Sequence, residues 1–460
     1  MTLKITLAKP EVKFPVKRQG LGGDVGMPLG LLYLGAYARE NSDVDVEIRD
    51  YRLDEALGKP RNLQEDLADS DVVGVGACTV ESPDALRILR EAKRMGKATV
   101  MGGLFPTFNS EAVLNTGFVD FVVRGEGERG LVGLLDALGG HKPLEGVKGV
   151  SFREGDRIIH NPDADLIKDL DSLPMPAYDL IPVEQYAQFA SAPIYSARGC
   201  PMTCNFCTLN KMWGFQHRTR SPEDIVAEIE MLKSFGFDRV HFKDETVTLN
   251  RKRAMELFGE IERAELGMSY KVKSRIDQID EPLLQQMMRA GVDTIHTGIE
   301  TLSREAQRRM SKPISEATIR NAFDVMLGNG CNVNPVYLFG YGGETPTELE
   351  TDTRFIREIG SRSGVITYIS FMTPHPQAGV SADELEILTT DLSRYNHKQP
   401  VAVPRSLGRD GLRRMVDTYH EVTGEVGMRH VNPRVDPVYL GQILKAKPAM
   451  ETRGESELAA

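Results

Sequence analysis

The chain has 460 residues, and its 56 lysines and arginines against 66 aspartates and glutamates give a formal net charge of −10. A hydrophobic fraction of 41% and a charged fraction of 27% are those of an ordinary globular protein with several domains. The acidic balance argues against nucleic acid and anionic membranes as partners. We expect a cytoplasmic protein, because we find no signal segment and no apolar run near the roughly 18 residues of a membrane span.

Short apolar β-type runs alternate with helical patterns over the first 140 residues. The β-type runs cover 5–8, 44–50, 72–77 and 98–102, and the helical patterns cover 28–40 and 85–95. Such alternation is typical of parallel βαβ units, so we predict an α/β, doubly wound Rossmann-like domain over 1–144. Glycine-rich turns at 102–104 and 124–128 follow strand ends, where ligands bind in sheets of this kind.

A different pattern follows over 145–192, which we interpret as a linker containing a hairpin at 146–159. From residue 193 the alternation resumes, with strands expected at 194–197, 239–243, 270–274, 294–299, 334–340 and 365–371. Six βα units predict a partial (β/α)6 barrel of the TIM type over 193–385, with its site at the strand carboxyl ends. The remainder, 386–460, is predicted to be helical with a disordered tail.

Three of the five cysteines fall within eight residues at the end of the first barrel strand. Cys200, Cys204 and Cys207 form a C-x3-C-x2-C motif, whereas Cys78 and Cys331 stand alone in apolar, strand-like surroundings. Thiolates at the motif's spacing can hold one face of an iron–sulfur cube and leave one iron open to a ligand. A zinc site, for which His217 is a possible fourth ligand, and a chance cluster of structural cysteines are the alternatives.

The motif, with an aromatic Phe206 before its third cysteine, resembles the radical S-adenosylmethionine (SAM) superfamily. The resemblance implies that Cys200, Cys204 and Cys207 ligate a 4Fe-4S cluster, and that one electron, from a donor such as flavodoxin or ferredoxin, cleaves SAM to a 5′-deoxyadenosyl radical. It further implies SAM-site roles for Phe206, Asp244, Glu245, Ser274, Arg275, Glu300 and Gly340. Taken singly, an acid at a strand end is as often a helix cap or part of a surface ion pair.

The segments ahead of the barrel resemble the cobalamin-binding domain of one large radical SAM class. The resemblance implies cobalamin contacts from Pro28, Gly30, Thr79, Gly102, Gly103, Leu104, Thr107, Gly125, Glu126 and Gly127. A Rossmann-like domain for another ligand is the alternative, although no G-x-G-x-x-G turn follows the first strand. None of the nine histidines lies in the first 140 residues and D-x-H-x-x-G is missing, so we expect cobalt to have no protein histidine on its lower face.

Together the two modules imply methylation of an unactivated carbon in a small-molecule substrate, with hydrogen abstraction by the deoxyadenosyl radical and methyl transfer from methylcobalamin. Tyr337, Tyr341 and His296 are our candidate catalytic residues, with Tyr368 and His375 as further polar groups, although each is equally consistent with a buried core position. We expect Trp213 to be a core or interface anchor.

Two alternative functions remain open. The segment 391–401 is similar to part of the anaerobic magnesium-protoporphyrin monomethyl ester oxidative cyclases, which would mean oxidation or rearrangement without methyl transfer. The other alternative is a cobalamin-binding carrier or sensor whose cluster is structural.

Overall fold

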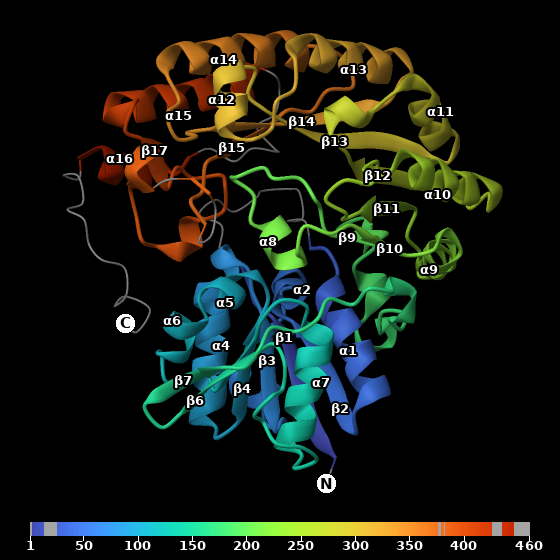
Figure 1. Ribbon diagram of the computed structural model, residues 1–460, viewed down its shortest axis with the longest axis vertical. Coiled ribbons are helices and arrows are strands. Elements are labelled where there is room, and N and C mark those ends of the chain that lie inside the picture. The colour runs from blue at the N-terminus through green and yellow to red at the C-terminus, as the bar shows by residue number, and fades with distance from the viewer. Residues whose placement is uncertain (1, 13–24, 376–378, 381, 426–434, 446–460) are drawn as a thin grey trace.

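The computed structural model describes residues 2–12, 25–375, 379–380, 382–425 and 435–445. The chain forms two α/β domains, each built on one large sheet. In Figure 1 the amino-terminal domain lies below and the second domain lies above. Among the described residues, no helix is long and apolar enough to cross a membrane.

The first sheet has seven strands in the order β2-β1-β3-β4-β5-β6-β7. Its parallel part consists of β1 (Leu3–Lys9), β2 (Val44–Asp50), β3 (Val72–Gly76), β4 (Ala98–Gly102) and β5 (Phe121–Val123). The hairpin β6 (Val150–Glu154) and β7 (Arg157–His160) pairs antiparallel with β5. The hairpin therefore continues the first sheet, so our domain boundary at residue 144 cuts through this sheet.

Helices cover both faces of this sheet, as the doubly wound prediction requires. On one face, α1 (Leu29–Asn41) packs beside α7 (Gly127–Leu138). On the other face, α4 (Ser82–Arg94), α5 (Leu104–Phe108) and α6 (Ser110–Leu114) share a separate buried apolar cluster. Two short helices, α2 (Tyr51–Ala56) and α3 (Leu63–Asp66), follow β2, and the Asp50 side chain caps α2.

The second sheet is open, with six parallel strands in the order β15-β14-β13-β12-β11-β8. These strands are β8 (Ala192–Ile194), β11 (Arg239–Phe242), β12 (Ser269–Lys273), β13 (Val292–Glu300), β14 (Asn332–Phe339) and β15 (Tyr368–Phe371). The arrangement confirms the six-stranded partial barrel. Between β8 and the hairpin, the connecting segment contains the 3-10 turns Leu170–Ser172, Tyr178–Leu180 and Val183–Gln185.

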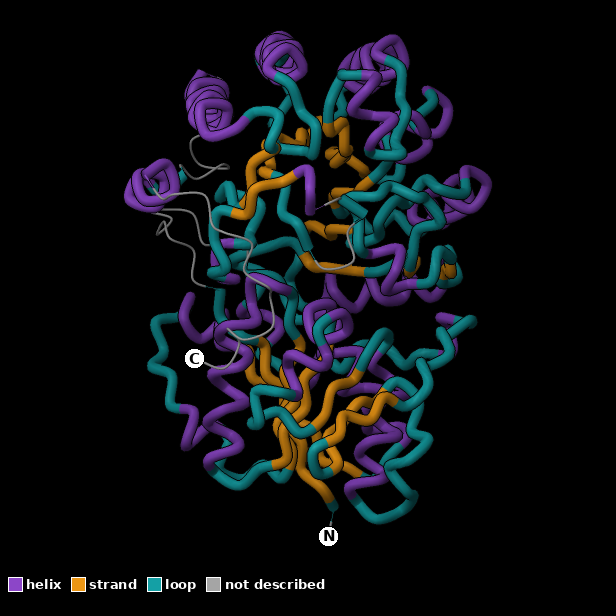
Figure 2. The backbone as a smooth tube through the Cα atoms, turned by 60° about the vertical axis from the view of Figure 1, so that its left-hand side comes forward, coloured by secondary structure: helices purple, strands orange, loops and turns teal. Residues whose placement is uncertain are grey.

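Helices cover the outer face of the second sheet (Figures 1 and 2). They are α9 (Pro222–Ser234), α10 (Arg251–Arg263), α11 (Glu281–Arg289), α13 (Glu316–Gly328) and α14 (Pro346–Gly360), and the short α12 (Arg304–Arg309) precedes α13. Each of the five longer helices begins at a polar residue whose side chain accepts a first-turn backbone N–H, namely Ser221, Asn250, Asp280, Ser315 and Thr345.

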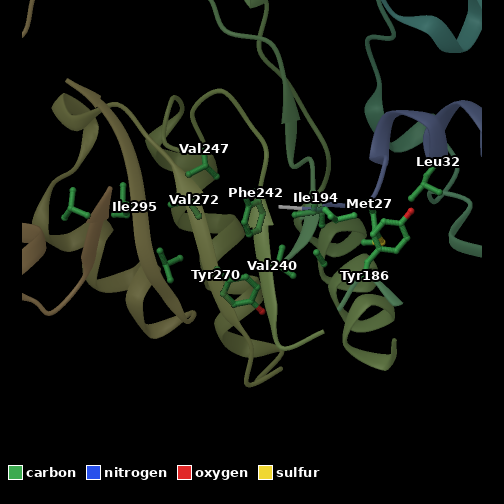
Figure 3. Close-up of a cluster of buried hydrophobic side chains, with 14 of the residues drawn as sticks. Met27, Leu32, Tyr186, Ile194, Val240, Phe242, Val247, Tyr270, Val272 and Ile295 are labelled. Atoms are coloured by element: carbon green, nitrogen blue, oxygen red, sulfur yellow. The ribbon is translucent and has the colours of Figure 1, made fainter. Parts of the chain in front are cut away.

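Alternate residues of the barrel strands face opposite sides of the sheet. One set forms the buried apolar layer beneath the helices, and Figure 3 shows Ile194, Val240, Phe242, Tyr270, Val272 and Ile295 in it. The residues between them, including His241, Lys271, Lys273 and His296, are half-buried and face the inside of the barrel. The inner face is therefore polar and partly open to solvent.

The carboxy-terminal segment is less helical than expected, because it starts with a hairpin of β16 (Leu385–Ile387) and β17 (Ala402–Pro404). Helix α15 (Gly408–Glu425) then packs against α14, and α16 (Pro437–Lys445) follows. Our prediction of a disordered tail concerns residues 446–460, which lie outside the described residues.

Candidate functional site

A cavity of about 420 Å³ lies between the two domains. Eight of the ten residues that we expected to hold cobalamin line it: Pro28, Gly30, Gly102, Gly103, Leu104, Gly125, Glu126 and Gly127. The second domain contributes Pro193, Tyr195, Arg198, Met212, Trp213 and Lys243. The carboxyl-end turns of the first sheet thus face the start of the barrel across one cavity, as expected for a ligand site in a doubly wound fold.

Glycines on the first-domain side of the cavity let the backbone approach a flat ligand. Gly103 has φ +95°, and a Cβ there would lie 2.9 Å from the carbonyl oxygen of Ala77. A Cβ on Gly30 or Gly125 would meet nothing within 4 Å. Thr107 does not line the cavity, but its hydroxyl accepts the Gly125 N–H (3.1 Å) and donates to the Gly103 carbonyl (2.7 Å). The residues therefore fit a broad macrocycle such as cobalamin.

Two expected cobalamin contacts have other partners. The hydroxyl of Thr79 lies 3.2 Å from Nδ1 of His375, and Thr79 does not line the cavity. The carboxylate of Glu126 is buried and pairs with Arg198 (3.2 Å) and Arg218 (2.8 Å), while Glu128 pairs with Arg198 at 2.7 Å. Glu126 thus holds the two domains together, because both arginines come from the barrel domain.

The second-domain wall of the cavity is aromatic and cationic. The guanidinium of Arg198 lies 5.3 Å from the ring centre of Tyr33 and 5.8 Å from that of Trp213. Trp213 ends α8 (Leu209–Trp213), which begins two residues after Cys207, so it connects the cavity to the cysteine loop. Cys78, which we expected inside a strand, lines the cavity instead, and burial raises the pKa of its thiol to about 12.

The three motif cysteines occupy a loop between β9 (Ala197–Arg198) and β10 (Arg218–Thr219), which pair antiparallel. Gly199, with φ +94°, opens this loop, and a Cβ there would lie 2.0 Å from the Gln216 carbonyl oxygen. All three thiols are free and half-buried. Backbone N–H groups donate to the sulfurs of Cys200 and Cys207.

The donor set of three thiols and nearby N–H groups fits an iron–sulfur cluster. Nowhere in the described part of the chain do three His, Cys, Asp or Glu side chains converge closely enough to hold a metal ion as they stand. In a 4Fe-4S cluster each of three cysteines binds a different iron, so the three thiols need not converge on one point. Phe206, which lies in this loop, packs against a buried cluster that includes Met310, Leu338, Tyr341 and Met372.

The two acids after β11 have different roles. Asp244 is buried, and its Oδ1 accepts the backbone N–H groups of Ser196 (2.7 Å) and Ala197 (3.2 Å), so it positions the loop strand rather than facing a ligand. Burial raises the pKa of Glu245, while Lys273 and the Gly199 N–H act in the opposite direction. Glu245 is therefore the acid of this pair that lies beside the cysteine loop.

The other expected SAM contacts lie at the strand carboxyl ends, but several are engaged within the protein. The hydroxyl of Ser274 is 2.5 Å from that of Thr248. Burial lowers the pKa of Arg275, but its ion pair with Asp277 and the nearby thiols of Cys204 and Cys200 outweigh this effect and raise it. Glu300, at φ +64°, pairs with Lys312 at 2.8 Å, which occupies one of its two carboxylate oxygens.

The three candidate catalytic residues are not brought together. Tyr337 is fully buried and its ring packs against Phe355 of α14, so it faces the helices and takes the buried core position that was the alternative to a catalytic role. The hydroxyl of Tyr341 lies 2.9 Å from both the Asn205 Oδ1 and the Arg309 carbonyl oxygen and donates its one hydrogen between them, so Tyr341 supports the cysteine loop. His296 alone lies on the inner face of the sheet, with its ring 4.8 Å from that of Tyr368.

Glu344 is buried in the loop after β14, where its carboxylate accepts the Gly340 N–H at 2.7 Å. Burial raises the pKa of Glu344 from 4.5 to about 8, so the folded state retains a proton that the unfolded state loses above pH 4.5. The stability contribution of this proton is complete below pH 4.5 and is lost as the pH rises through about 8.

We expect Glu344→Gln to reduce the loss of unfolding free energy between pH 5 and 8, by at most about 1.4 kcal/mol per pH unit for one group. Denaturant unfolding at several pH values measures this slope. Glu350→Gln, on an exposed position of α14, serves as the control and should leave the slope as in the wild type. An unchanged slope in Glu344→Gln would contradict the assignment.

Two family models match the chain, the B12 binding domain over residues 22–135 and the Radical SAM superfamily over residues 194–356. An uncharacterized methyltransferase of Pyrococcus horikoshii is 30% identical over 87% of both chains. The anaerobic magnesium-protoporphyrin IX monomethyl ester cyclase of Rubrivivax gelatinosus is 27% identical, over 84% of this chain and 71% of the relative.

Among solved structures, the fold is similar to that of the radical S-adenosylmethionine methyltransferase TsrM from Kitasatospora setae with cobalamin and a [4Fe-4S] cluster bound. The TM-score is 0.72 at 17% identity, over 95% of this chain and 91% of that chain. The B12 binding domain precedes the Radical SAM domain in the chain, and the cavity lies between the two. The chain belongs to the cobalamin-dependent radical SAM enzymes.

Proposed function

We propose that this enzyme is a C-methyltransferase that acts on an unactivated carbon of a small-molecule substrate. The observation that carries the proposal is the single cavity, whose walls come from the cobalamin-type turns of the first domain and from the segment that follows the cysteine loop. When bound, the cluster with SAM supplies a carbon radical and cobalamin supplies a methyl group. Because the cobalamin-type turns face Met212 and Trp213, which follow the three cysteines, across this cavity, a substrate held there would lie between the two binding regions.

The residues of the chain divide this task. Cys200, Cys204 and Cys207 would hold the cluster, and Glu245 beside their loop would contribute to the SAM site. The glycine turns at 102–103 and 125–127 would admit the cobalamin ring, and Trp213 would close the cavity on the barrel side. A one-electron donor of the flavodoxin or ferredoxin type would supply the electron for SAM cleavage.

The products formed from SAM test this proposal. The reconstituted enzyme is incubated anaerobically with SAM, methylcobalamin, a strong reductant and candidate substrates, and the nucleosides are quantified. Methyl transfer predicts 5′-deoxyadenosine and S-adenosylhomocysteine in about equal amounts together with a methylated product. Deoxyadenosine with an oxidised product and no S-adenosylhomocysteine would overturn methyl transfer in favour of cyclase-type chemistry, and the absence of both nucleosides would favour a carrier.

We further propose that cobalt has no histidine ligand on its lower face. The first histidine in the sequence is His141, and the described lining of the cavity contains none. The electron paramagnetic resonance spectrum of the cob(II)alamin-loaded enzyme is expected to lack nitrogen superhyperfine splitting from a protein histidine. Loading with uniformly ¹⁵N-histidine-labelled protein provides the control, because any histidine-derived splitting would change with the isotope.

A further inference from the structure

The inner face of the barrel concentrates positive charge on two neighbouring strands. Their inward positions are Arg239 and His241 on β11, and Lys271 and Lys273 on β12, and neither strand contains an acidic residue. Asp293 pairs with Arg239 at the amino end of the sheet, and Glu245 and Asp244 interact electrostatically with Lys273 at the carboxyl end. Lys398 lies 5.6 Å from the ring centre of Tyr368, whose ring is 4.8 Å from that of His296.

These cations surround two histidines that stay neutral. Burial, the largest cause, lowers the pKa of His241 to about 2 and the pKa of His296 to about 3. The positive charges of Lys243, Lys271 and Lys273 lower both pKa values further. The strand register places His241 beside Lys271 and Lys273 beside His296. The inner face is thus a positively charged surface with two neutral imidazoles at its centre.

The hydrogen bond between Lys243 and His241 fixes the tautomer of this histidine. The Lys243 ammonium lies 2.9 Å from His241 Nδ1 and can only donate, so Nδ1 accepts and the ring proton is on Nε2. His241 Nε2 is buried and has no hydrogen-bond partner among the residues that the structure describes. His241 therefore offers an N–H donor that the protein does not satisfy.

Two further buried atoms on the same face have no hydrogen-bond partner within the described part of the chain. They are Nε2 of His296 and Oδ1 of Asn334, whose backbones are in register on β13 and β14, and Asn334 is only 4% exposed. Buried polar atoms are nearly always hydrogen-bonded, so orphaned atoms gathered on one face indicate that a polar ligand completes them. Lysines and an imidazole N–H suit a ligand oxygen that carries negative charge.

We propose that the inner face of the barrel at His241, Lys271 and His296 binds an anionic group of the substrate, a carboxylate or a phosphate-type group. The inference rests on the proposed function: Lys243 lines the cavity between the domains and contacts His241, so the inner face of the barrel adjoins the space in which the substrate would lie. Lys271 lies two residues before Lys273 on β12, and therefore about 7 Å farther along the strand from the cysteine loop. Lys271 is accordingly the residue that distinguishes a substrate anion from the SAM carboxylate.

Calorimetric titration of the anaerobic enzyme, loaded with cluster and cobalamin and saturated with SAM, tests the proposal. The probes are inorganic pyrophosphate and citrate, so that phosphate-type and carboxylate recognition are compared directly. We expect saturable binding of at least one probe, weakened more than about tenfold in Lys271→Met, which removes the charge but keeps the aliphatic chain. Lys271→Arg, which keeps the charge, should restore binding and shows that a loss is not caused by misfolding.

Lys252→Met is the matched control, because Lys252 is exposed on α10, which covers the outer face of the sheet. Equal affinities of the wild type and Lys271→Met, equal weakening by Lys252→Met, or no binding of either probe to the SAM-saturated wild type would overturn the proposal. The titration is independent of turnover, so its failure is distinguishable from failure of methyl transfer, which the nucleoside assay measures separately. In histidine-labelled protein, the signals of His241 and His296 should shift when the bound probe is added.

Discussion

Replacement of Cys204 by alanine is expected to abolish SAM cleavage. Cys204 is the middle residue of the three-cysteine loop, and two remaining thiolates cannot hold a cluster face with one open iron. The loss should exceed the roughly 10–100-fold typical for an outer-shell partner of a metal site. Iron content, the visible absorption of the cluster and 5′-deoxyadenosine formation measure the effect in the anaerobically reconstituted protein.

Cys331→Ala is the control for this experiment, because Cys331 is buried on the strand side of the second domain and its pKa is raised to about 12 by burial. The control variant should retain iron and SAM cleavage even if it is less stable. Retention of a full cluster by Cys204→Ala would contradict the assignment of the loop.

Replacement of Glu126 by glutamine should strongly destabilise the contact between the domains. Glu126, Arg198 and Arg218 are all buried, and the neutral side chain would leave the Arg218 guanidinium without its carboxylate. Breaking a buried pair by removing one charge costs about 3–5 kcal/mol. The melting temperature should decrease. The affinity for cobalamin should decrease as well, because Glu126 also lines the cavity.

A surface ion pair provides the comparison for Glu126. Glu260 pairs with Arg263 on α10, where both side chains are exposed, and Glu260→Gln should change stability by less than about 1 kcal/mol. If the two glutamine variants were equally stable, the buried pair would have no role in joining the domains.

The features of the fold that could be predicted from the sequence depend on residues close together in the chain. The doubly wound order, the six barrel strands and the glycine turns follow from periodicity and from backbone conformations that only glycine adopts easily, as at Gly103 and Gly199. The cysteine spacing likewise depends on neighbouring residues alone. For this reason the order of the two domains could be inferred from the sequence.

Contacts between distant residues explain what the sequence does not predict. Glu126 meets Arg218 across 92 positions and Thr79 meets His375 across 296, and neither pairing leaves a local pattern. The sequence did indicate the buried position of Tyr337, because alternate residues of a strand face the same side and Tyr337 alternates with the buried Val333 and Phe339 on β14. The lysines of β12 also carried a signal, since alternating lysines on a central parallel strand are unusual for an apolar core.

The cavity takes its walls from both domains, and this has a thermodynamic consequence for assembly. A ligand that binds only when the domains are docked contributes its binding free energy to their docking, by about 2.7 kcal/mol when its free concentration is 100 times its dissociation constant. Cobalamin uptake and domain closure are therefore linked equilibria. The melting temperature of the whole chain should accordingly increase with the concentration of free cobalamin, and the connecting segment 161–191 should become more resistant to proteases as the cofactor is taken up.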